Sequence, residues 1–527
     1  MKKNVFFPVI LLVVTFFLGC TLGNSDEDKK NNDKPDEPTE LSKVTLYFTS
    51  FNSQESTLEV DGFRVYGYGD ASLDVDVEPE YITVSDDSLT AWVTLQENNG
   101  IAKISLSGTP QITDIFPLGF KDYSSGDNKI DANDKDELSG TDKRSNYDNL
   151  YGMYQPDAIA HYEYNGLTYL LTANEGEARE WGPFIDEARV KDITLDPIAF
   201  PNAEDLQENG MIGRLNVTTN IFSSTAVTTH DKLYTFGARS FSVWNGTNGA
   251  LIWDSGVDTE QRAVDAGTYD DGRSDNKGAE PEGITVGTVG DKVFAFVGLE
   301  RADAVLIYDI TNPVNPVYSQ TLTHPDNSDD APEGLLFIPA VNSPSSNPLL
   351  IVSNEESATV SIWESNSSGV FAHKSTIQLD GGVGAAEISA YCKTTKKLFV
   401  VNNGIDNLAS QIDIIDLTNI DSPTVLSPIV TTDYGTNINS VAIRNGLLAV
   451  ALEGANKTDT GKAVLFKTSD SSFVGQIGTG AQPDMITFSP DGKFILTADE
   501  GEPSDDYSID PKGSITVIRI PSSFYSN

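Results

Sequence analysis

The chain alternates short runs of branched and aromatic residues with breaks rich in Gly, Asp, Asn and Pro. Beyond residue 43 no long stretch keeps the 3.6-residue period of an amphipathic helix, and the apolar runs have the length of strands. Tyr81–Val84 and Thr90–Leu95, for example, are two such runs joined by a Ser-Asp-Asp-Ser turn. The pattern predicts an all-β body.

A recurring unit organises these runs. Its first copy opens with Glu78-Pro79-Glu80 and closes with Gln96-Glu97. The other clear copies pair an opening with a closing sequence as follows: Gln155-Pro156-Asp157 with Asn174-Glu175-Gly176, Glu280-Pro281-Glu282 with Leu299-Glu300-Arg301, Pro332-Glu333 with Asn354-Glu355, Ala386-Glu387 with Asn402-Asn403, Asn439-Ser440 with Leu452-Glu453, and Gln482-Pro483-Asp484 with Asp499-Glu500-Gly501. A weaker copy spans Leu233 to Trp244, where Tyr234–Gly237 and Phe241–Trp244 are predicted to pair.

Repeated small antiparallel sheets are typical of a β-propeller, in which the repeats are arranged radially. The weak copy, or a hairpin inserted in a long loop, can be miscounted. We therefore expect seven or eight blades, with eight favoured, in a single propeller domain over residues 44–527.

The amino terminus has the pattern of a bacterial lipoprotein. Lys2 and Lys3 precede an apolar run, Val5–Leu18, that is short for a membrane span and typical of a signal peptide. Cys20 follows a small residue, as in a lipobox, although Phe17 stands where Leu is usual. This predicts a signal peptide over residues 1–19 and lipidation of Cys20. An ordinary secretory signal with an incidental cysteine is the alternative.

The segment after the signal has almost nothing to bury. Residues 20–43 are mainly Asn, Asp, Glu, Lys and Pro, so we expect a disordered acidic tether behind the lipidated cysteine. Together the two segments predict an extracytoplasmic, membrane-anchored lipoprotein at the cell surface or in the periplasm.

The charge balance of the chain limits the partners that it can bind. The chain has 78 acidic and 35 basic residues, a net charge of -43, which excludes nucleic acid as a partner and disfavours an anionic membrane face. The four histidines, at positions 161, 230, 324 and 373, are far apart in the sequence and predict no zinc cluster. Two cysteines cannot form a disulfide framework. We expect a monomer with an oxygen-rich surface.

Paired acids give the repeat its chemistry. Glu80 and Glu97 are 17 residues apart, and Asp484 and Glu500 are 16 apart. A hairpin of two strands brings both ends to the same rim, so the acids converge on the axis if the first strands are innermost. Like charges at that density repel strongly unless cations, arginines or backbone donors offset them, and the cation we expect is calcium. The candidate ligands are Glu80, Glu97, Asp157, Glu175, Glu282, Glu300, Glu333, Glu355, Asp484 and Glu500. Alternatively, these carboxylates only cap strand ends.

Several longer motifs resemble a known family. They are Pro117–Asp122, Leu171–Glu180, Asp186–Asp192, Arg239–Trp244 and Gly298–Arg301. With the repeat from about Glu78 to Ile520, these motifs resemble the choice-of-anchor I family of bacterial surface propellers, which is similar to mesenchyme-specific cell-surface glycoproteins. The resemblance implies a surface-attached propeller whose anchor differs between members. Some relatives carry an alkaline-phosphatase label, but the resemblance brings no catalytic residue set, and the catalytic residues stay unknown.

The order of the segments departs from the family. The part resembling Ala386 to Ile520 usually comes first, which implies a circular permutation. A closed ring tolerates new termini between any two repeats. It also predicts that the strand near Val44–Phe48 pairs with Ser514–Ile520 and closes the ring.

Two further groups of residues are candidates for binding. The acidic loop with Asp127, Asp131, Asp134 and Asp136 departs from the EF-hand pattern, yet an irregular acidic loop can bind calcium; a solvated loop is the alternative. Arg179, Arg189, Arg239 and Arg301 lie in or beside the acidic motifs and could bind phosphate, or else neutralise neighbouring carboxylates.

The sequence thus leads to two hypotheses about function. The favoured one is a cell-surface-anchored propeller whose acidic axial face binds calcium and an unknown surface partner or small ligand. The alternative is a metal-dependent phosphoester hydrolase, alkaline-phosphatase-like or phytase-like, on the same face. Neither a Gly-x-Ser-x-Gly motif nor a histidine cluster supports serine or zinc chemistry.

Overall fold

The computed structural model describes residues 40–67, 71–135, 144–181, 184–222, 225–326, 328–404 and 409–525, all within one contact unit, Pro38–Asn527. Seven sheets of this unit have four antiparallel strands each. Their first strands are β2 (Pro79–Val84), β8 (Ile159–Tyr164), β17 (Pro281–Val289), β21 (Pro332–Ile338), β25 (Ala385–Cys392), β29 (Ile438–Arg444) and β33 (Pro483–Phe488).

The remaining three strands of each sheet lie progressively farther from its first strand. The second strands are β3 (Thr90–Leu95), β9 (Leu167–Asn174), β18 (Lys292–Leu299), β22 (Leu349–Asn354), β26 (Lys397–Asn402), β30 (Leu447–Leu452) and β34 (Phe494–Asp499). The third strands are β4 (Gly100–Ser105), β15 (Ser240–Asn245), β19 (Ala304–Asp309), β23 (Thr359–Ser365), β27 (Gln411–Asp416), β31 (Thr460–Lys467) and β35 (Ser514–Arg519). The fourth strands are β5 (Gln111–Pro117), β16 (Leu251–Asp254), β20 (Val317–Leu322), β24 (Phe371–Gln378), β28 (Thr424–Val430), β32 (Phe473–Ala481) and β1 (Ser42–Tyr47).

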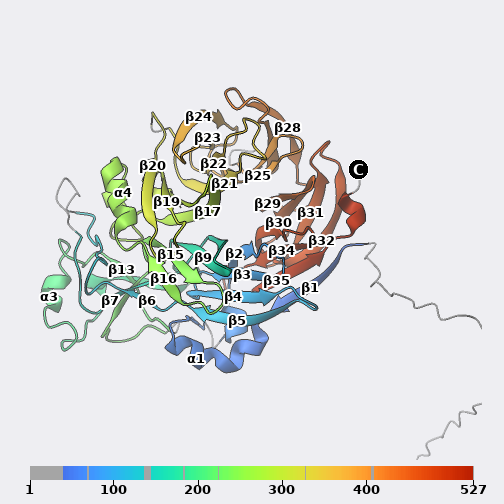
Figure 1. Ribbon diagram of the computed structural model, residues 1–527. Helices are drawn as coiled ribbons and strands as arrows, with labels where there is room; N and C mark the ends of the chain where they lie inside the picture. The colour runs from blue at the N-terminus through green and yellow to red at the C-terminus, as the bar shows by residue number, and fades with distance from the viewer. Residues whose placement is uncertain are drawn as a thin grey trace, which may run out of the picture. The chain divides into compact units, whose positions relative to one another are not determined.

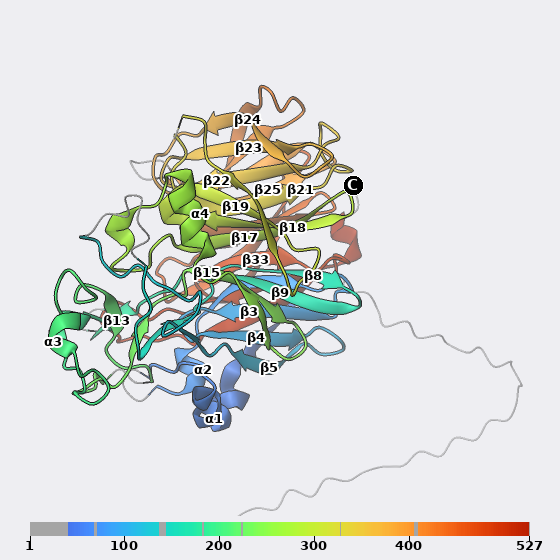
Figure 2. The ribbon, with the colours of Figure 1, turned by 60° about the vertical axis from the view of Figure 1, so that its left-hand side comes forward.

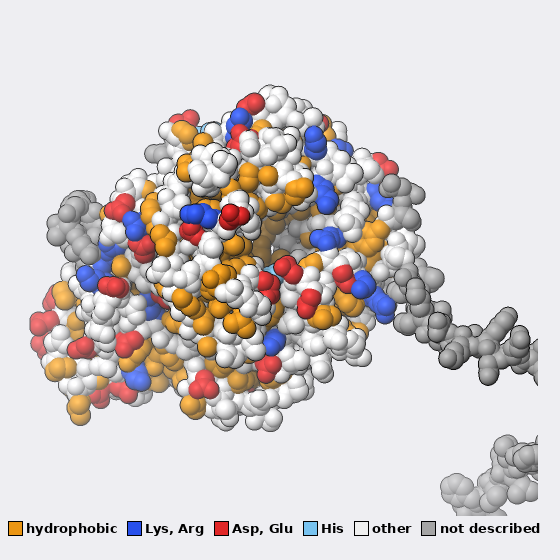
Figure 3. Space-filling model, in the orientation of Figure 1, with side chains coloured by type: hydrophobic (Ala, Val, Ile, Leu, Met, Phe, Trp, Pro, Cys, Tyr) orange, Lys and Arg blue, Asp and Glu red, His pale blue; other side chains and the backbone are white. Residues whose placement is uncertain are grey.

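The sheets form a closed ring. Each first strand contacts the first strand of the next sheet, and β33 contacts β2, so the order β2, β8, β17, β21, β25, β29, β33 returns to its start. The sheets surround a centre in the view of Figure 1, and the space-filling view in Figure 3 is hollowed there. This arrangement confirms the predicted all-β propeller.

The chain closes the ring by joining its two ends in one sheet. β1 pairs antiparallel with β35 over its full length, from Ser42 opposite Arg519 to Tyr47 opposite Ser514. The predicted pairing of the first strand with the last strands is therefore confirmed. Because this sheet contains strands from both ends of the chain, the ring cannot open at the junction without breaking a strand pair.

The hydrophobic core is divided among the spaces between sheets. Seven of the eight buried clusters combine side chains of two neighbouring sheets, as when Val93 of β3 packs in one cluster with Leu496 of β34. The second strands are covered on both faces, and every residue of β22 and β30 is buried. The fourth strands are mostly exposed or half-buried instead, because they lie at the outer edges of the sheets.

A long excursion between β5 and β15 interrupts the repeat. It holds β6 (Phe120–Asp122), β7 (Leu150–Met153), β10 (Glu180–Trp181), β11 (Phe184–Ile185), β12 (Glu187–Arg189), η3 (Val190–Asp192), α3 (Ala203–Leu206), β13 (Asn216–Thr218) and β14 (Leu233–Thr235), besides β8 and β9. A separate hydrophobic cluster supports it. Figures 1 and 2 both show α3 and β13 outside the ring of sheets.

The predicted pairing inside the weak repeat is wrong. β14 joins β7 in a parallel pair, whereas β15 pairs with β9, so the strands of Leu233–Trp244 belong to two different sheets. Both segments have sequences that favour strands, because strand propensity depends on local residues. The long excursion, however, places β7 rather than β15 beside β14.

The remaining elements are short helices. They are η1 (Phe48–Gln54), α1 (Glu55–Val60), α2 (Leu73–Asp76), α4 (Asp258–Ala266), η4 (Asp271–Arg273), η5 (Glu300–Ala302) and η6 (Ser522–Tyr525). Among the described residues, none of the helices combines the length and the apolar composition needed to cross a bilayer. The predicted signal peptide, Cys20 and nearly all of the tether lie outside the described residues.

Candidate metal centre at the axial rim

The first strands share a backbone irregularity that aims their acids inward. In six of them the register against the second strand shifts near the start, for example between Pro79 and Ile82 and between Pro483 and Met485. Glu80 and Asp484 lie inside these shifts. A β-bulge of this kind bends the strand and redirects a side chain.

A left-handed residue precedes four of these strands or the turn that leads into them. Gln155, Glu280, Ala331 and Gln482 have φ values of 41°, 50°, 58° and 49°, and each stands directly before a proline. This conformation is strained for a residue with a Cβ and is found mainly where the surrounding structure requires it. Each of these prolines, and the acid directly after it, therefore follows a sharp turn that leads the chain into the ring.

The acids meet on the axis. A cavity of about 220 Å³ is lined by residues at or just before the start of all seven first strands, including Glu80, Asp157, Glu282, Glu333 and Asp484. Glu175, directly after the second strand β9, also lines it. The predicted convergence of the paired acids on one central hole is thus present for six of the ten candidates in this cavity.

Three buried carboxylates form one cluster, which we call the Glu80 group. Glu80, Glu97 and Glu500 each contribute an oxygen, and these oxygens lie within 4.8 Å of one another. Their exposed fractions are 8%, 4% and 8%, and among the described residues none of them has an ion pair with Lys, Arg or His. Gln482 Nε2 donates to Glu500 Oε2 at 2.5 Å, but Glu97 Oε2 is buried without a hydrogen-bond partner.

Burial makes the charged form of this group costly. It raises the pKa of Glu80 well above its usual value, with further repulsion from Asp484 and Glu97. Burial likewise raises the pKa of Glu97, and burial with repulsion from Glu80 raises that of Glu500. A cation between the three oxygens would reverse this cost, because an adjacent positive charge favours the ionised carboxylate.

A second cluster comprises Asp157, Glu175 and Glu282, whose oxygens also lie within 4.8 Å of one another. Gln96 Nε2 donates to Glu175 at 3.0 Å, and Lys277 Nζ lies 2.6 Å from the other Glu175 oxygen. Burial raises the pKa of Asp157 and of Glu282 well above the usual values. Glu282 Oε2 is buried without a partner, so this second group is only partly neutralised.

A third cluster is largely neutralised by the protein itself. Glu175, Glu280 and Glu300 come within the same 4.8 Å limit. The basic partners of this cluster are Arg273 at 2.5 Å and Lys277 at 3.3 Å from Glu280, and Arg301 at 2.8 Å from Glu300. Burial and repulsion from Glu175 still raise the pKa of Glu300 to about 7. With these partners in place, the third cluster has the least need for a metal ion.

The choice-of-anchor I domain family matches residues 28–313 and 387–526. This chain belongs to that family. The matched residues include every member of the Glu80 group and of the second group, whereas Glu333 and Glu355 fall between the two matched segments.

Two curated proteins are similar to this choice-of-anchor I chain. Gigasin-3a of Magallana gigas is 30% identical over 188 residues, which cover 30% of this chain and 66% of that protein. The mesenchyme-specific cell surface glycoprotein of Strongylocentrotus purpuratus is 29% identical over 296 residues, 46% of this chain and 36% of that protein. The chain therefore spans less than two thirds of either relative.

Solved structures are similar at low sequence identity. U3-55K is 10% identical, with a TM-score of 0.45 and coverage of 84% of this chain and 96% of its own. The WD40 repeats of RRP9 have the same identity and TM-score, with coverage of 84% and 94%.

Some residues of this choice-of-anchor I site were missed from sequence. Glu78 and Glu280 each precede the repeated proline, and the Glu-Pro-Glu motif that they share could have drawn attention to both. Glu387 accepts hydrogen bonds from Asn403 Nδ2 at 3.1 and 3.0 Å, and burial raises its pKa to about 8. Lys277 had no sequence signal, because it reaches the rim from a loop.

The four candidate phosphate-binding arginines all contact carboxylates. The pairs are Arg179 with Asp76 and Glu78, Arg189 with Asp275, Arg239 with Glu260, and Arg301 with Glu300 and Glu356. These contacts agree with the alternative role of neutralising neighbours. Phosphate binding by these four residues stays a prediction.

The acidic loop does not gather its described acids at one point. Asp134 pairs with Arg214 at 2.5 Å, while Asp131 Oδ2 accepts a hydrogen bond from the Tyr269 hydroxyl at 3.2 Å. Asp136 lies outside the described residues. Among the residues that are described, the acid groups spaced to hold an ion do not include Asp127, Asp131 or Asp134.

Distance along the sequence was misleading for the histidines. His324 and His373 lie side by side, with ring centroids 4.6 Å apart. Their rings share a hydrogen-bond partner in Thr376. Within the part of the chain that is described, the groups with metal-ligand spacing contain neither histidine.

Proposed function

We propose that this protein is an extracytoplasmic, surface-anchored propeller of seven blades whose axial acids bind calcium. The seven four-stranded sheets and their closed order of contacts support the blade number. Family membership, together with the similarity to a protein named as a cell surface glycoprotein, supports the location. The Glu80 group and the second group are the two proposed ion sites.

One observation carries the calcium proposal. Glu80, Glu97 and Glu500 are buried together without an ion pair to any described basic residue, and one Glu97 oxygen has no hydrogen bond. Burying unpaired carboxylates is expensive, and proteins normally pair such charges or bind a metal with them. Calcium suits an all-oxygen ligand set, whereas zinc usually takes histidine or cysteine. Its flexible coordination also accepts water molecules beside three carboxylates.

Direct binding measurements test this proposal. Purified protein freed of metal with a chelator is titrated with calcium by calorimetry, and the bound ion is counted by elemental analysis after dialysis. Glu80→Gln should weaken or abolish one site. Glu204→Gln changes an exposed residue of α3 and serves as the matched control. Failure of the unaltered protein to bind calcium, or equal binding by Glu80→Gln, would overturn the assignment.

The anchor is proposed from the sequence alone. A lipid on Cys20, followed by the acidic tether of residues 20–43, would hold the propeller outside the membrane. Labelling cells with a fatty acid should mark the unaltered protein and leave Cys20→Ser unmarked. If Cys20→Ser is also labelled, or if neither protein is, the lipidation proposal fails.

The hydrolase alternative has less support. A phosphoesterase would need cations to hold the substrate phosphate. The guanidinium groups of Arg179 and Arg301 already contact carboxylates. We therefore favour binding over catalysis at the rim. Release of nitrophenol from nitrophenyl phosphate, dependent on calcium and lost in Glu282→Gln, would reverse this preference.

A further inference from the structure

A larger cavity lies at the other end of three of the first strands. β25 enters the ring beside Glu387 and ends at Cys392, and the residues around Cys392 line a cavity of about 500 Å³. The ends of β21 and β29 and the carboxyl-terminal η6 complete its wall. Because a strand has its two ends on opposite faces of the ring, this cavity is distinct from the acidic rim.

Its charge is opposite to that of the protein. The lining includes Lys393, Arg444 and Lys467 but no aspartate or glutamate, in a chain with 78 acidic and 35 basic residues. Within the described part of the chain, neither Lys393 nor Arg444 forms an ion pair with a carboxylate, and Arg444 Nε is buried without a hydrogen-bond partner. This differs from the rim, where Arg273, Lys277 and Arg301 are all paired with acids.

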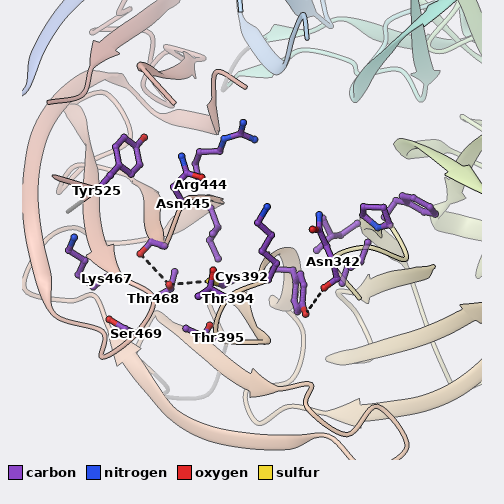
Figure 4. A pocket seen from close by; sticks show the side chains of 18 residues that line it. Asn342, Cys392, Thr394, Thr395, Arg444, Asn445, Lys467, Thr468, Ser469 and Tyr525 are labelled. Atoms are coloured by element: carbon purple, nitrogen blue, oxygen red, sulfur yellow. Dashed lines mark hydrogen bonds between the residues drawn. The ribbon is translucent and has the colours of Figure 1, made fainter. Parts of the chain in front are cut away.

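Contacts between side chains and backbone hold the wall of this cavity in place. Cys392 Sγ lies 3.2 Å from Thr468 Oγ1, which donates to the Gly446 carbonyl at 3.2 Å. On the other side the Tyr391 hydroxyl donates to the Asn342 carbonyl at 3.1 Å. Figure 4 shows Arg444, Lys467 and Tyr525 on one side of the cavity and Asn342 across from them. The site is thus held by contacts between neighbouring sheets before any ligand enters.

The lining also offers an apolar surface. Phe337, Ile338 and Ile443 line the same cavity as the cations, together with the ring of Tyr391. The volume of about 500 Å³ is that of a small-molecule site, and the lining combines these apolar side chains with a similar share of polar groups. Guanidinium and ammonium groups recognise phosphate and carboxylate through charge-assisted hydrogen bonds.

We propose that this cavity binds a small anionic ligand in which a phosphate or carboxylate group is attached to an apolar or aromatic body. The anionic group would contact Arg444 and Lys393, and the body would lie against Phe337 and Ile443. A free inorganic anion would use only the first set of contacts and bind more weakly. An uncharged aromatic molecule would lack the contacts with Arg444 and Lys393.

Calorimetry with defined probes tests this assignment in the purified protein. Phenyl phosphate and benzoate each carry one of the two anionic groups on an aromatic ring. Phenol, which has only the ring, and inorganic phosphate, which has only the anionic group, are the half-ligands. At least one of the first two should bind more tightly than both half-ligands, and added salt should weaken the binding. Arg444→Gln should reduce the affinity about tenfold or more, as expected for loss of a hydrogen bond to a charged group. Lys393→Gln should reduce it less, because Lys393 is exposed.

Controls separate this site from the rim. Lys232→Gln removes an exposed lysine that does not line the cavity and should leave binding unchanged. All titrations are run with chelator, so a ligand held through calcium at the rim would give no signal. Arg444→Lys, which keeps the charge, should restore part of the affinity if Arg444→Gln has not simply disturbed the fold. Binding by neither anionic probe, or equal binding by the unaltered protein and Arg444→Gln, would overturn the proposal.

Discussion

The sharpest test of the Glu80 group is a change of sign in the effect of one mutation. Glu97→Gln keeps the shape of the side chain and removes one negative charge from three clustered carboxylates. Without metal, we expect the variant to be more stable than the unaltered protein, because repulsion is relieved. With saturating calcium, we expect it to be less stable, because one charged ligand is lost.

The geometry sets the size of the effect. Two unit charges 4.8 Å apart repel by about 3.5 kcal/mol at an effective dielectric constant of about 20. Glu97 faces two such partners, so full ionisation would put the relief near 7 kcal/mol, about twice that pair value. The raised pKa values mean that the metal-free group is partly protonated, which lowers the expected gain to about 1–3 kcal/mol. Calcium at about a thousand times its Kd should stabilise the unaltered protein by about 4.1 kcal/mol, which exceeds that gain and reverses the sign of the effect.

Urea unfolding followed by tryptophan fluorescence measures both effects. The midpoint is compared for the unaltered protein, Glu97→Gln and the control Glu204→Gln, each in chelator and in calcium. The reasoning is refuted if Glu97→Gln lowers the midpoint by the same amount in both conditions. That result would mean that Glu97 only accepts hydrogen bonds at a strand end. A shift in the Glu204→Gln control would show an effect of overall charge instead.

Three further predictions concern pH, ion number and ring closure. In chelator, stability should fall as pH rises from about 4 to about 8, because Asp484 and Glu387 have pKa values raised to about 7 and about 8 and the folded state therefore binds more protons than the unfolded state over that range. Urea midpoints across pH check this, and a rise would contradict it. Asp157→Asn should lower the calcium count by one while leaving the Glu80 group occupied, as elemental analysis can show; an unchanged count would remove the second site. Leu46→Ala should cost about 2–3 kcal/mol of unfolding free energy, since Leu46 in β1 is 8% exposed. Val44→Ala in the same strand should cost less than half of that, because Val44 is 40% exposed. Equal costs in denaturant titrations would mean that β1 does not close the core.

Strands and hairpins could be predicted because they depend on neighbours in the sequence. Glu80 and Glu97 lie at the two ends of one hairpin, whose register is fixed by a short turn and by alternating apolar residues. The same local geometry places Asp484 and Glu500 together. Even ring closure could be inferred, because the permuted order of segments in a closed ring requires the strand near Val44–Phe48 to pair with Ser514–Ile520, and β1 does pair with β35.

The bulges and left-handed turns that aim the acids were not visible. Gln482 and Ala331 are ordinary residues in the sequence, yet both take positive φ values at the entry to a first strand. Nothing in their chemistry demands this conformation. It is imposed by the packing of the ring, which decides where each first strand must begin.

The sequence by itself determined which acids share a hairpin end, since both members of each pair are joined by a few hydrogen-bonded residues. Only the tertiary structure decided which hairpins meet, because contacts between sheets join residues hundreds of positions apart. Glu500 completes the group of Glu80 and Glu97 in this way, and Lys277 reaches Glu175 across a similar boundary. The long excursion gave Leu233–Thr235 its partner β7, and the far ends of three sheets together form a cavity whose lining has no aspartate or glutamate.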